Sequence, residues 1–157
     1  MGLDMYLRKR IYIGANYEHN NVKGEINITK GEENKPVKIN LNKVTYIIED
    51  AGYWRKANQI HKWMVENVQN DEDDCKEYYV SDDKLEELLS LCKQVKANHT
   101  LAKKLLPTQD GFFFGDTEYG EYYFQDIDDT IKIIEDIFSE KEENGYYPFE
   151  VYYQSSW

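Results

Sequence analysis

The segment from Tyr53 to Val68 constrains the fold of this 157-residue chain most strongly, because it holds two of the three tryptophans and a complete apolar stripe. On an α-helix, at about 100° per residue, its apolar side chains fall on one side. That stripe consists of Tyr53, Ala57, Ile60, Met64 and Val68. We therefore predict an amphipathic helix over residues 53–68 that covers the core of the domain.

The two borders of this predicted helix combine aromatic rings with polar side chains. One border carries Trp54, Asn58, His61 and Val65, and the other carries Lys56, Trp63 and Asn67. A ring beside a guanidinium or ammonium group suits a planar ligand that bears a phosphate or another anion. The helix is therefore a candidate ligand site, and packing at the edge of the core is the alternative interpretation.

Composition limits the classes of protein that fit. Aromatic residues make up 15% of the chain, which is too many for a disordered protein even at a net charge of −11. The acidic balance disfavours nonspecific nucleic-acid binding. Cys75 and Cys92 lack the spacing of a metal or disulfide motif, and no apolar run reaches the roughly 20 residues of a membrane span. We expect a cytoplasmic protein with no membrane association, metal or cofactor.

Strand and helix patterns alternate along the chain. Leu3, Met5 and Leu7 share one face of a first strand that begins at the N-terminus. The other predicted strands cover residues 23–30, 37–41, 44–48, 77–80, 112–114 and 148–153, and the other predicted helices cover 81–92, 97–106 and 126–139. The acidic residues 71–74 are expected to form a solvated turn. These patterns predict one α+β domain over 1–157, with helices on one face of a mainly antiparallel sheet.

Four blocks of sequence resemble a known family. They are the opening Met1–Leu7, which contains GLDMYL, the stretch Tyr53–Trp63 that reads YWRKANQIHKW, the stretch Asp74–Tyr78, and the stretch Leu106–Tyr119 that contains GFFFG. The chain resembles, over most of its length, small uncharacterised proteins of bacteriophages and bacteria. The resemblance implies a phage or prophage setting, in the host cytoplasm, where small acidic proteins often counter host defence. It brings no established reaction.

The leading hypothesis is a non-enzymatic protein that captures a small anionic, nucleotide-like ligand and antagonises host defence signalling. Its candidate ligand-binding residues are Asp4, Tyr6, Trp54, Arg55, Asn58, His61, Lys62, Trp63, Tyr119 and Tyr122. The alternative is an acidic inhibitor of a basic host protein, which would use residues 71–74 together with Glu118, Glu121, Asp126, Asp128 and Asp129.

A third hypothesis is a hydrolase with His61 as general base. That role would need an orienting carboxylate such as Asp4 or Glu77. A buried core histidine is the default interpretation, and no catalytic residue is assigned. Exposed tyrosines make a homo-oligomer a further expectation.

Overall fold

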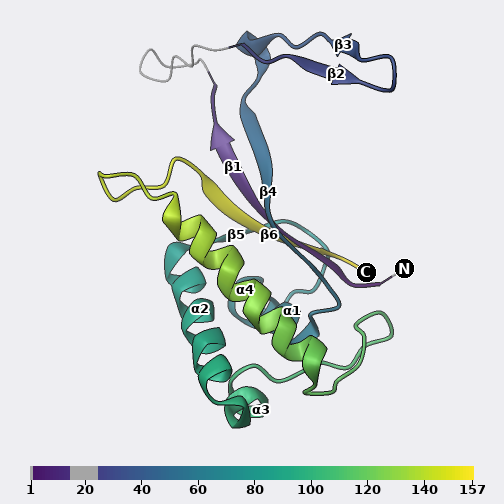
Figure 1. Cartoon of the computed structure of the whole chain (residues 1–157), viewed down its shortest axis with the longest axis vertical. Coiled ribbons are helices and arrows are strands. Elements are labelled where there is room, and N and C mark those ends of the chain that lie inside the picture. The colour runs from purple at the N-terminus through teal and green to yellow at the C-terminus, as the bar shows by residue number, and fades with distance from the viewer. Residues whose placement is uncertain (1, 15–24) are drawn as a thin grey trace.

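The central element of the fold is a four-stranded antiparallel sheet with the strand order β4-β1-β6-β5 (Figure 1). The structure is a computed structural model that describes residues 2–14 and 25–157. The strands of this sheet are β1 (Asp4–Tyr12), β4 (Tyr46–Arg55), β5 (Tyr78–Val80) and β6 (Glu150–Ser156). The predicted α+β class and the mainly antiparallel sheet are confirmed.

Helices account for most of the remaining described chain. The α-helices are α1 (Asn58–Asn67), α2 (Asp82–Ala97), α3 (Ala102–Leu105) and α4 (Glu121–Ser139), and the 3₁₀ turns are η2 (Leu41–Lys43) and η3 (His99–Leu101). The Ser81 side chain caps α2 by accepting a hydrogen bond from the Lys84 amide, as its position predicts. No helix in the described ranges has both the length and the apolar character needed to cross a membrane.

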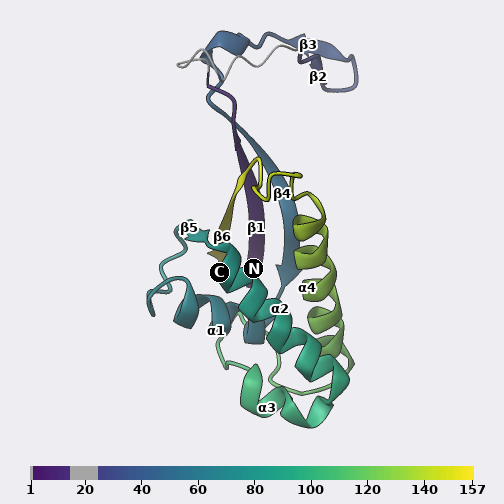
Figure 2. The ribbon, with the colours of Figure 1, turned by 90° about the vertical axis from the view of Figure 1, so that its left-hand side faces the viewer.

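β1 lies at the middle of the sheet, between β4 and β6, and its alternating side chains separate two environments. Leu3, Met5 and Leu7 are 0% exposed and belong to the core cluster that α1, α2 and α4 complete. The side chains between them lie on the opposite face. None of the described helices covers that face (Figure 2). The predicted first strand is therefore present, but it begins at Asp4 and extends to Tyr12; its predicted start at Met1 lies outside the described residues.

The predicted helix over residues 53–68 is wrong in its first five positions. Tyr53 to Arg55 continue β4, paired with β1, so that Trp54 opposes Met5. Lys56 then adopts a left-handed backbone with φ of 63°, which ends the strand, and α1 begins at Asn58. The strand wins because pairing with β1 buries Trp54 to 3% exposure, which an isolated amphipathic pattern does not reveal.

Gly52 in β4 lies directly against α4. A Cβ atom built on Gly52 would lie 2.6 Å from Cγ2 of Ile133 in α4. The register of β1 against β4 shifts next to this position, between Leu7 and Arg8. A residue without a side chain is therefore needed where the helix rests on the strand.

Other boundaries also differ from the predictions: the strand predicted at 44–48 is the start of the longer β4, and the helix predicted over 97–106 divides into η3 and α3. Two differences are larger. Residues 112–114 form a turn and not a strand: the Phe114 amide donates to Gly111, the Leu3 amide donates to Phe113, and Phe112 is 96% exposed. α4 begins at Glu121, five residues before the predicted start. Both errors lie beside the cavity described below.

A hairpin is present, with the strands β2 (Ile28–Lys30) and β3 (Lys35–Val37). The first strand lies within the predicted one, whereas the strand predicted over residues 37–41 is wrong beyond Val37, because the second strand begins two residues earlier and a 3₁₀ turn begins at Leu41. All six residues of β2 and β3 are exposed. The hairpin lies at the far end of the β1–β4 ribbon, away from the helices (Figures 1 and 2). The part of the first predicted hairpin strand at residues 23 and 24 lies outside the described residues.

Candidate ligand-binding site

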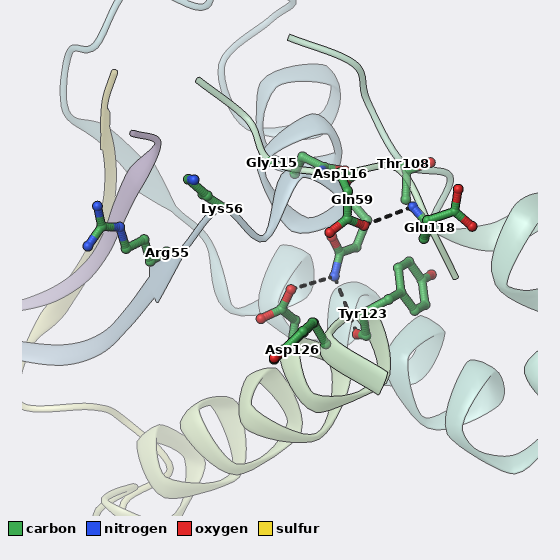
Figure 3. A pocket seen from close by; sticks show the side chains of 11 residues that line it. Arg55, Lys56, Gln59, Thr108, Gly115, Asp116, Glu118, Tyr123 and Asp126 are labelled. Atoms are coloured by element: carbon green, nitrogen blue, oxygen red, sulfur yellow. Dashed lines mark hydrogen bonds between the residues drawn. The ribbon is translucent and has the colours of Figure 1, made fainter. Parts of the chain in front are cut away.

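A cavity of about 340 Å³ lies where β4 turns into α1, and the start of α4 and the loop between α3 and α4 close it (Figure 3). This volume is within the range of small-molecule sites. Arg55 and Lys56 form one wall, and Asp116, Glu118 and Asp126 contribute carboxylates on the other side. Thr108, Tyr122 and Tyr123 complete the lining with hydroxyl groups and rings.

The two cations come from the strand-to-helix junction. Arg55 is the last residue of β4, and the Lys56 amide donates to the Leu3 carbonyl at 2.8 Å. Gly115, with φ of 88°, brings the opposite loop against Lys56: a Cβ atom there would lie 3.1 Å from Cβ of Lys56. The backbone of Lys56 is therefore fixed at the rim, and both cationic residues are exposed, with side chains that point away from Gln59 and Asp126 (Figure 3).

Asn58 ties the loop to α1 through all of its side-chain polar atoms. Its Nδ2 donates to the carbonyls of Phe114 at 3.0 Å and Asp116 at 2.8 Å, and its Oδ1 accepts from the Gln109 amide at 3.0 Å. Only 2% of Asn58 is exposed. The side chain is therefore engaged in holding the cavity wall, and its expected place on an open helix border is wrong.

Gln59 and Asp126 form the polar floor of the cavity. The Gln59 Nε2 donates to Oδ2 of Asp126 at 3.1 Å, and Gln59 itself is 2% exposed. Burial raises the pKa of Asp126 to about 6; the Gln59 hydrogen bond opposes this shift, whereas Asp129 and Asp116 add to it. A carboxyl group with this pKa changes charge close to neutral pH, which is a property common at functional sites.

The raised pKa of Asp126 predicts how stability depends on pH. Between pH 4 and 6 the folded protein binds a proton that the unfolded chain has released, so this carboxyl destabilises the fold increasingly as the pH rises. The variant Asp126→Asn keeps an acceptor for Gln59 and removes that charge. We expect its free energy of unfolding to exceed that of the parent at pH 7.5 and to converge with it at pH 4, measured by urea denaturation at both pH values. An equal difference at both pH values would contradict the assignment.

Of the ten predicted site residues, Arg55, Asn58 and Tyr122 line the cavity. Trp54 and Trp63 pack in the core, and Nε1 of Trp54 donates to Oγ1 of Thr130 at 2.9 Å. Tyr119 supports the wall, because its hydroxyl accepts from the Thr108 amide at 3.2 Å.

The remaining predicted residues lie outside the cavity. Asp4 and Tyr6 stand on the uncovered face of the sheet, where the Tyr53 hydroxyl donates to Asp4 and the rings of Tyr6 and Tyr53 lie 5.4 Å apart. Lys62 faces Glu66 on the surface of α1, with 3.9 Å between Nζ and Oε1.

His61 is a core histidine and does not line the cavity. It is 0% exposed, and its ring contacts the Tyr153 hydroxyl at 2.8 Å and the Asp73 carboxylate at 3.0 Å. Because a carboxylate only accepts, Nε2 carries the proton and Nδ1 accepts from Tyr153. Burial lowers the pKa of His61, and Asp73 offsets part of that shift. The imidazole is therefore neutral at pH 7.

The partner of His61 corrects two expectations. The carboxylate is that of Asp73, and neither Asp4 nor Glu77 contacts the ring. Asp73 also accepts from Nε1 of Trp157 at 3.1 Å, so the turn over residues 71–74 is not merely solvated. Its neighbour Asp74 accepts from the Lys76 amide at 3.1 Å, whereas Asp71 and Glu72 are exposed.

Several residues of the cavity were not among the predicted ones, namely Gln59, Thr108, Asp116, Glu118, Tyr123 and Asp126. A signal for Asp126 exists in the sequence: it lies three residues after Tyr123 and four before Thr130, on the buried side of α4. This signal can be recognised only if the helix is predicted to begin at Glu121, because a helix predicted from residue 126 leaves Tyr123 outside the pattern.

No family model, no curated protein and no solved structure matches the chain. Within residues 2–14 and 25–157, no group of three or more histidine, cysteine or acidic side chains could hold a metal ion. Cys75 and Cys92 are free thiols, and burial raises the pKa of Cys92 to about 12.

Proposed function

We propose that this protein binds a small ligand that carries an anionic group at one end and hydrogen-bond donors at the other. The observation that supports this best is a 340 Å³ cavity whose lining includes two cationic residues, Arg55 and Lys56, and the partly buried carboxyl of Asp126. Nucleotides match this division, with a phosphate for the cations and base amino groups for the carboxylates.

The environment of Asp126 supports a binding role over a purely structural one. A partly buried carboxylate with a raised pKa weakens the fold at neutral pH, and such groups concentrate at sites where they contact a ligand. The Gln59 amide orients it toward the cavity, since Gln59 is itself held between Asp126 and the Tyr123 carbonyl (Figure 3). A ligand amino group would replace the water that the carboxylate otherwise needs.

The alternative, an acidic inhibitor of a basic protein, has weaker support. α4 carries six acidic residues and one lysine, which favours it. However, Asp128 pairs with Lys96 at 2.7 Å and Asp129 with Lys132 at 3.5 Å. With Asp73 and Asp74 also engaged, many carboxylates of the expected inhibitory surface have partners within the chain. Antagonism of host defence stays a prediction that follows from the resemblance alone.

The test is a binding measurement with defined probes. Adenosine monophosphate, guanosine monophosphate, adenosine and inorganic phosphate are titrated into the parent protein by calorimetry. The proposal expects a monophosphate to bind more tightly than its nucleoside or free phosphate. Arg55→Gln should weaken that binding at least tenfold, because a charge-assisted hydrogen bond contributes about 1.5–3 kcal/mol.

The control is Lys104→Gln, which removes one exposed cation from α3, outside the cavity lining. Its affinity should equal that of the parent, and both variants should keep the parental thermal midpoint. Equal affinities for the parent and Arg55→Gln, or no binding of any probe by the parent, would count against the proposed site.

A further inference from the structure

The uncovered face of the sheet is unusually rich in tyrosine. Six tyrosines project from it: Tyr6, Tyr12, Tyr46, Tyr53, Tyr79 and Tyr152. Tyr53 is 50% exposed, Tyr79 is 55% exposed, and Ile48, on the same face of β4, is 54% exposed. A solvated antiparallel sheet face normally carries small polar and charged residues. This face instead has the composition of a protein interface, in which tyrosine and arginine are enriched.

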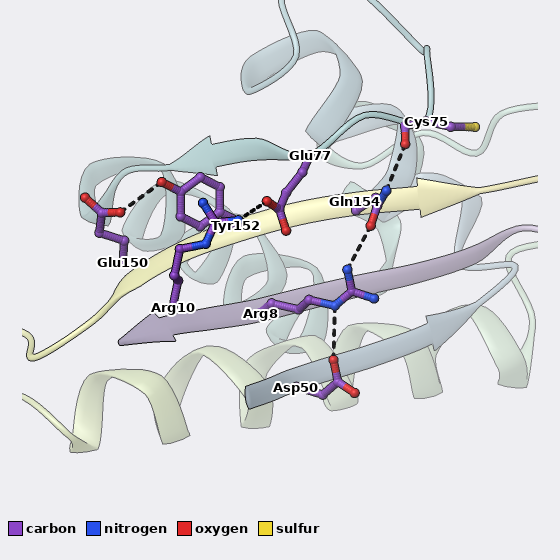
Figure 4. Close-up of polar contacts among 8 residues, drawn as sticks. All are labelled: Arg8, Arg10, Asp50, Cys75, Glu77, Glu150, Tyr152 and Gln154. Atoms are coloured by element: carbon purple, nitrogen blue, oxygen red, sulfur yellow. Dashed lines mark hydrogen bonds and ion pairs between the residues drawn. The ribbon is translucent and has the colours of Figure 1, made fainter. Parts of the chain in front are cut away.

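The side chains on this face are held in place by contacts that cross the strands (Figure 4). Arg8 donates to Asp50 on β4 at 3.2 Å and to Gln154 on β6 at 2.8 Å. Gln154 in turn donates to the Cys75 carbonyl at 3.1 Å. Groups that are already ordered lose little conformational entropy when a partner arrives.

A second set of contacts fixes the tyrosines themselves. The Arg10 guanidinium pairs with Glu77 and lies 4.0 Å from the ring centroid of Tyr152. On its other side it lies 5.6 Å from the ring of Tyr46. The Tyr152 hydroxyl donates to Glu150 at 2.9 Å. Rings and guanidinium groups on neighbouring strands are therefore in contact with one another across this face.

Charge on this surface does not suit nucleic acid. Arg8 and Arg10 are each engaged by a carboxylate, and Glu150 adds a further negative charge. Phosphate binding requires cations that are free to replace counterions. The surface is instead close to electrical balance, with donors, acceptors and ring faces intermixed.

We propose that a second copy of this chain docks on this face, related by a two-fold axis. An isologous interface needs one patch that complements itself, and a patch that holds arginines, carboxylates and tyrosine rings together does so. The rings and Ile48 offer on the order of 500 Å² of exposed surface, given about 200 Å² per aromatic side chain. The typical requirement is about 800 Å² per partner, which the intervening polar groups supply.

Net charge also favours this face for self-association. The chain carries a formal charge of −11, and α4, with its six acidic residues, lies on the other side of the sheet. A helical layer packs about 10 Å from a sheet, which exceeds the screening length of about 8 Å at physiological salt. Two copies that meet through the balanced face therefore keep their most acidic surfaces apart.

The experiment is sedimentation equilibrium of the full chain from 5 to 500 µM, with Ile48→Asp and Tyr79→Asp as interface variants. Phe112→Asp is the matched control, because Phe112 is 96% exposed, belongs to none of the strands that form this face, and receives the same charge. The expected result is a parental dimer that persists in 0.5 M NaCl. The dissociation constant should rise at least tenfold in both interface variants and stay unchanged in the control.

Circular dichroism and thermal midpoints verify that all variants are folded. A parent that remains monomeric throughout the range would overturn the proposal and leave the face to a different protein. A dimer that Phe112→Asp weakens as much as Ile48→Asp would also overturn it, since the effect would then come from net charge.

Discussion

Removal of residues 1–7 is expected to leave no folded domain. The deletion takes away the first half of β1, the strand that pairs with both β4 and β6. Leu3, Met5 and Leu7 are each 0% exposed, and burial of such a side chain stabilises a fold by about 1.5–3 kcal/mol. Together with the lost strand pairing, this approaches the entire stability of a small domain, about 5–15 kcal/mol.

Far-UV circular dichroism and a two-dimensional NMR spectrum measure the outcome. The control replaces residues 27–38 with a short Gly/Ser linker, which removes a comparable number of residues. In the described structure β2 and β3 pair only with each other, so this control should retain the parental spectrum and thermal midpoint. A soluble truncation of residues 1–7 with native chemical-shift dispersion would show that β1 is dispensable.

Asn58→Ala is expected to destabilise the protein by about 3 kcal/mol. The substitution leaves the carbonyls of Phe114 and Asp116 and the Gln109 amide without their partner, and buried groups left unsatisfied cost about 1–3 kcal/mol each. The total cost stays at about 3 kcal/mol because the loop can move so that water hydrates some of these three groups. The measurement is the midpoint and slope of urea unfolding.

The same helix offers a matched control in Asn67→Ala. Asn67 makes one side-chain hydrogen bond, to the Trp63 carbonyl within α1, and is partly exposed. Its loss should cost less than about 1 kcal/mol. If the two variants unfold at the same urea concentration, Asn58 does not hold the loop as the geometry indicates. A ligand-binding test at Asn58 would in any case confuse binding with folding, which is why Arg55 is the better choice.

The fold class could be predicted from those strands and helices that bury only one face, because burial on one face produces a periodic pattern of apolar residues. Leu3, Met5 and Leu7 alternate because one face of β1 meets the helices, and Ile127, Ile131 and Ile134 repeat at helical spacing because one side of α4 meets the sheet. The structure of residues 53–57 could not be predicted in this way, because their apolar pattern is compatible with both a helix and a strand. Pairing with β1, forty or more residues away, decides for a strand.

The cavity is harder to predict because three distant segments form it. Arg55 comes from the end of β4, Gly115 and Asp116 from a loop, and Asp126 from α4. Each is unremarkable among its neighbours in sequence, and the raised pKa of Asp126 exists only after the chain has buried it. Trp54 and Trp63, which are conspicuous in the sequence, owe their place to packing.

A substitution at Gly52 in the sheet would change the affinity of the cavity for its ligand. Because Ile133 rests where a Cβ atom would lie, the pair sets how deeply α4 sits, and Asp126 is carried on the same helix two turns earlier. A larger residue at position 52 would lift the helix and move the carboxylate away from Gln59 without touching any ligand. A larger side chain at position 52 should therefore be tolerated only together with a smaller side chain at position 133.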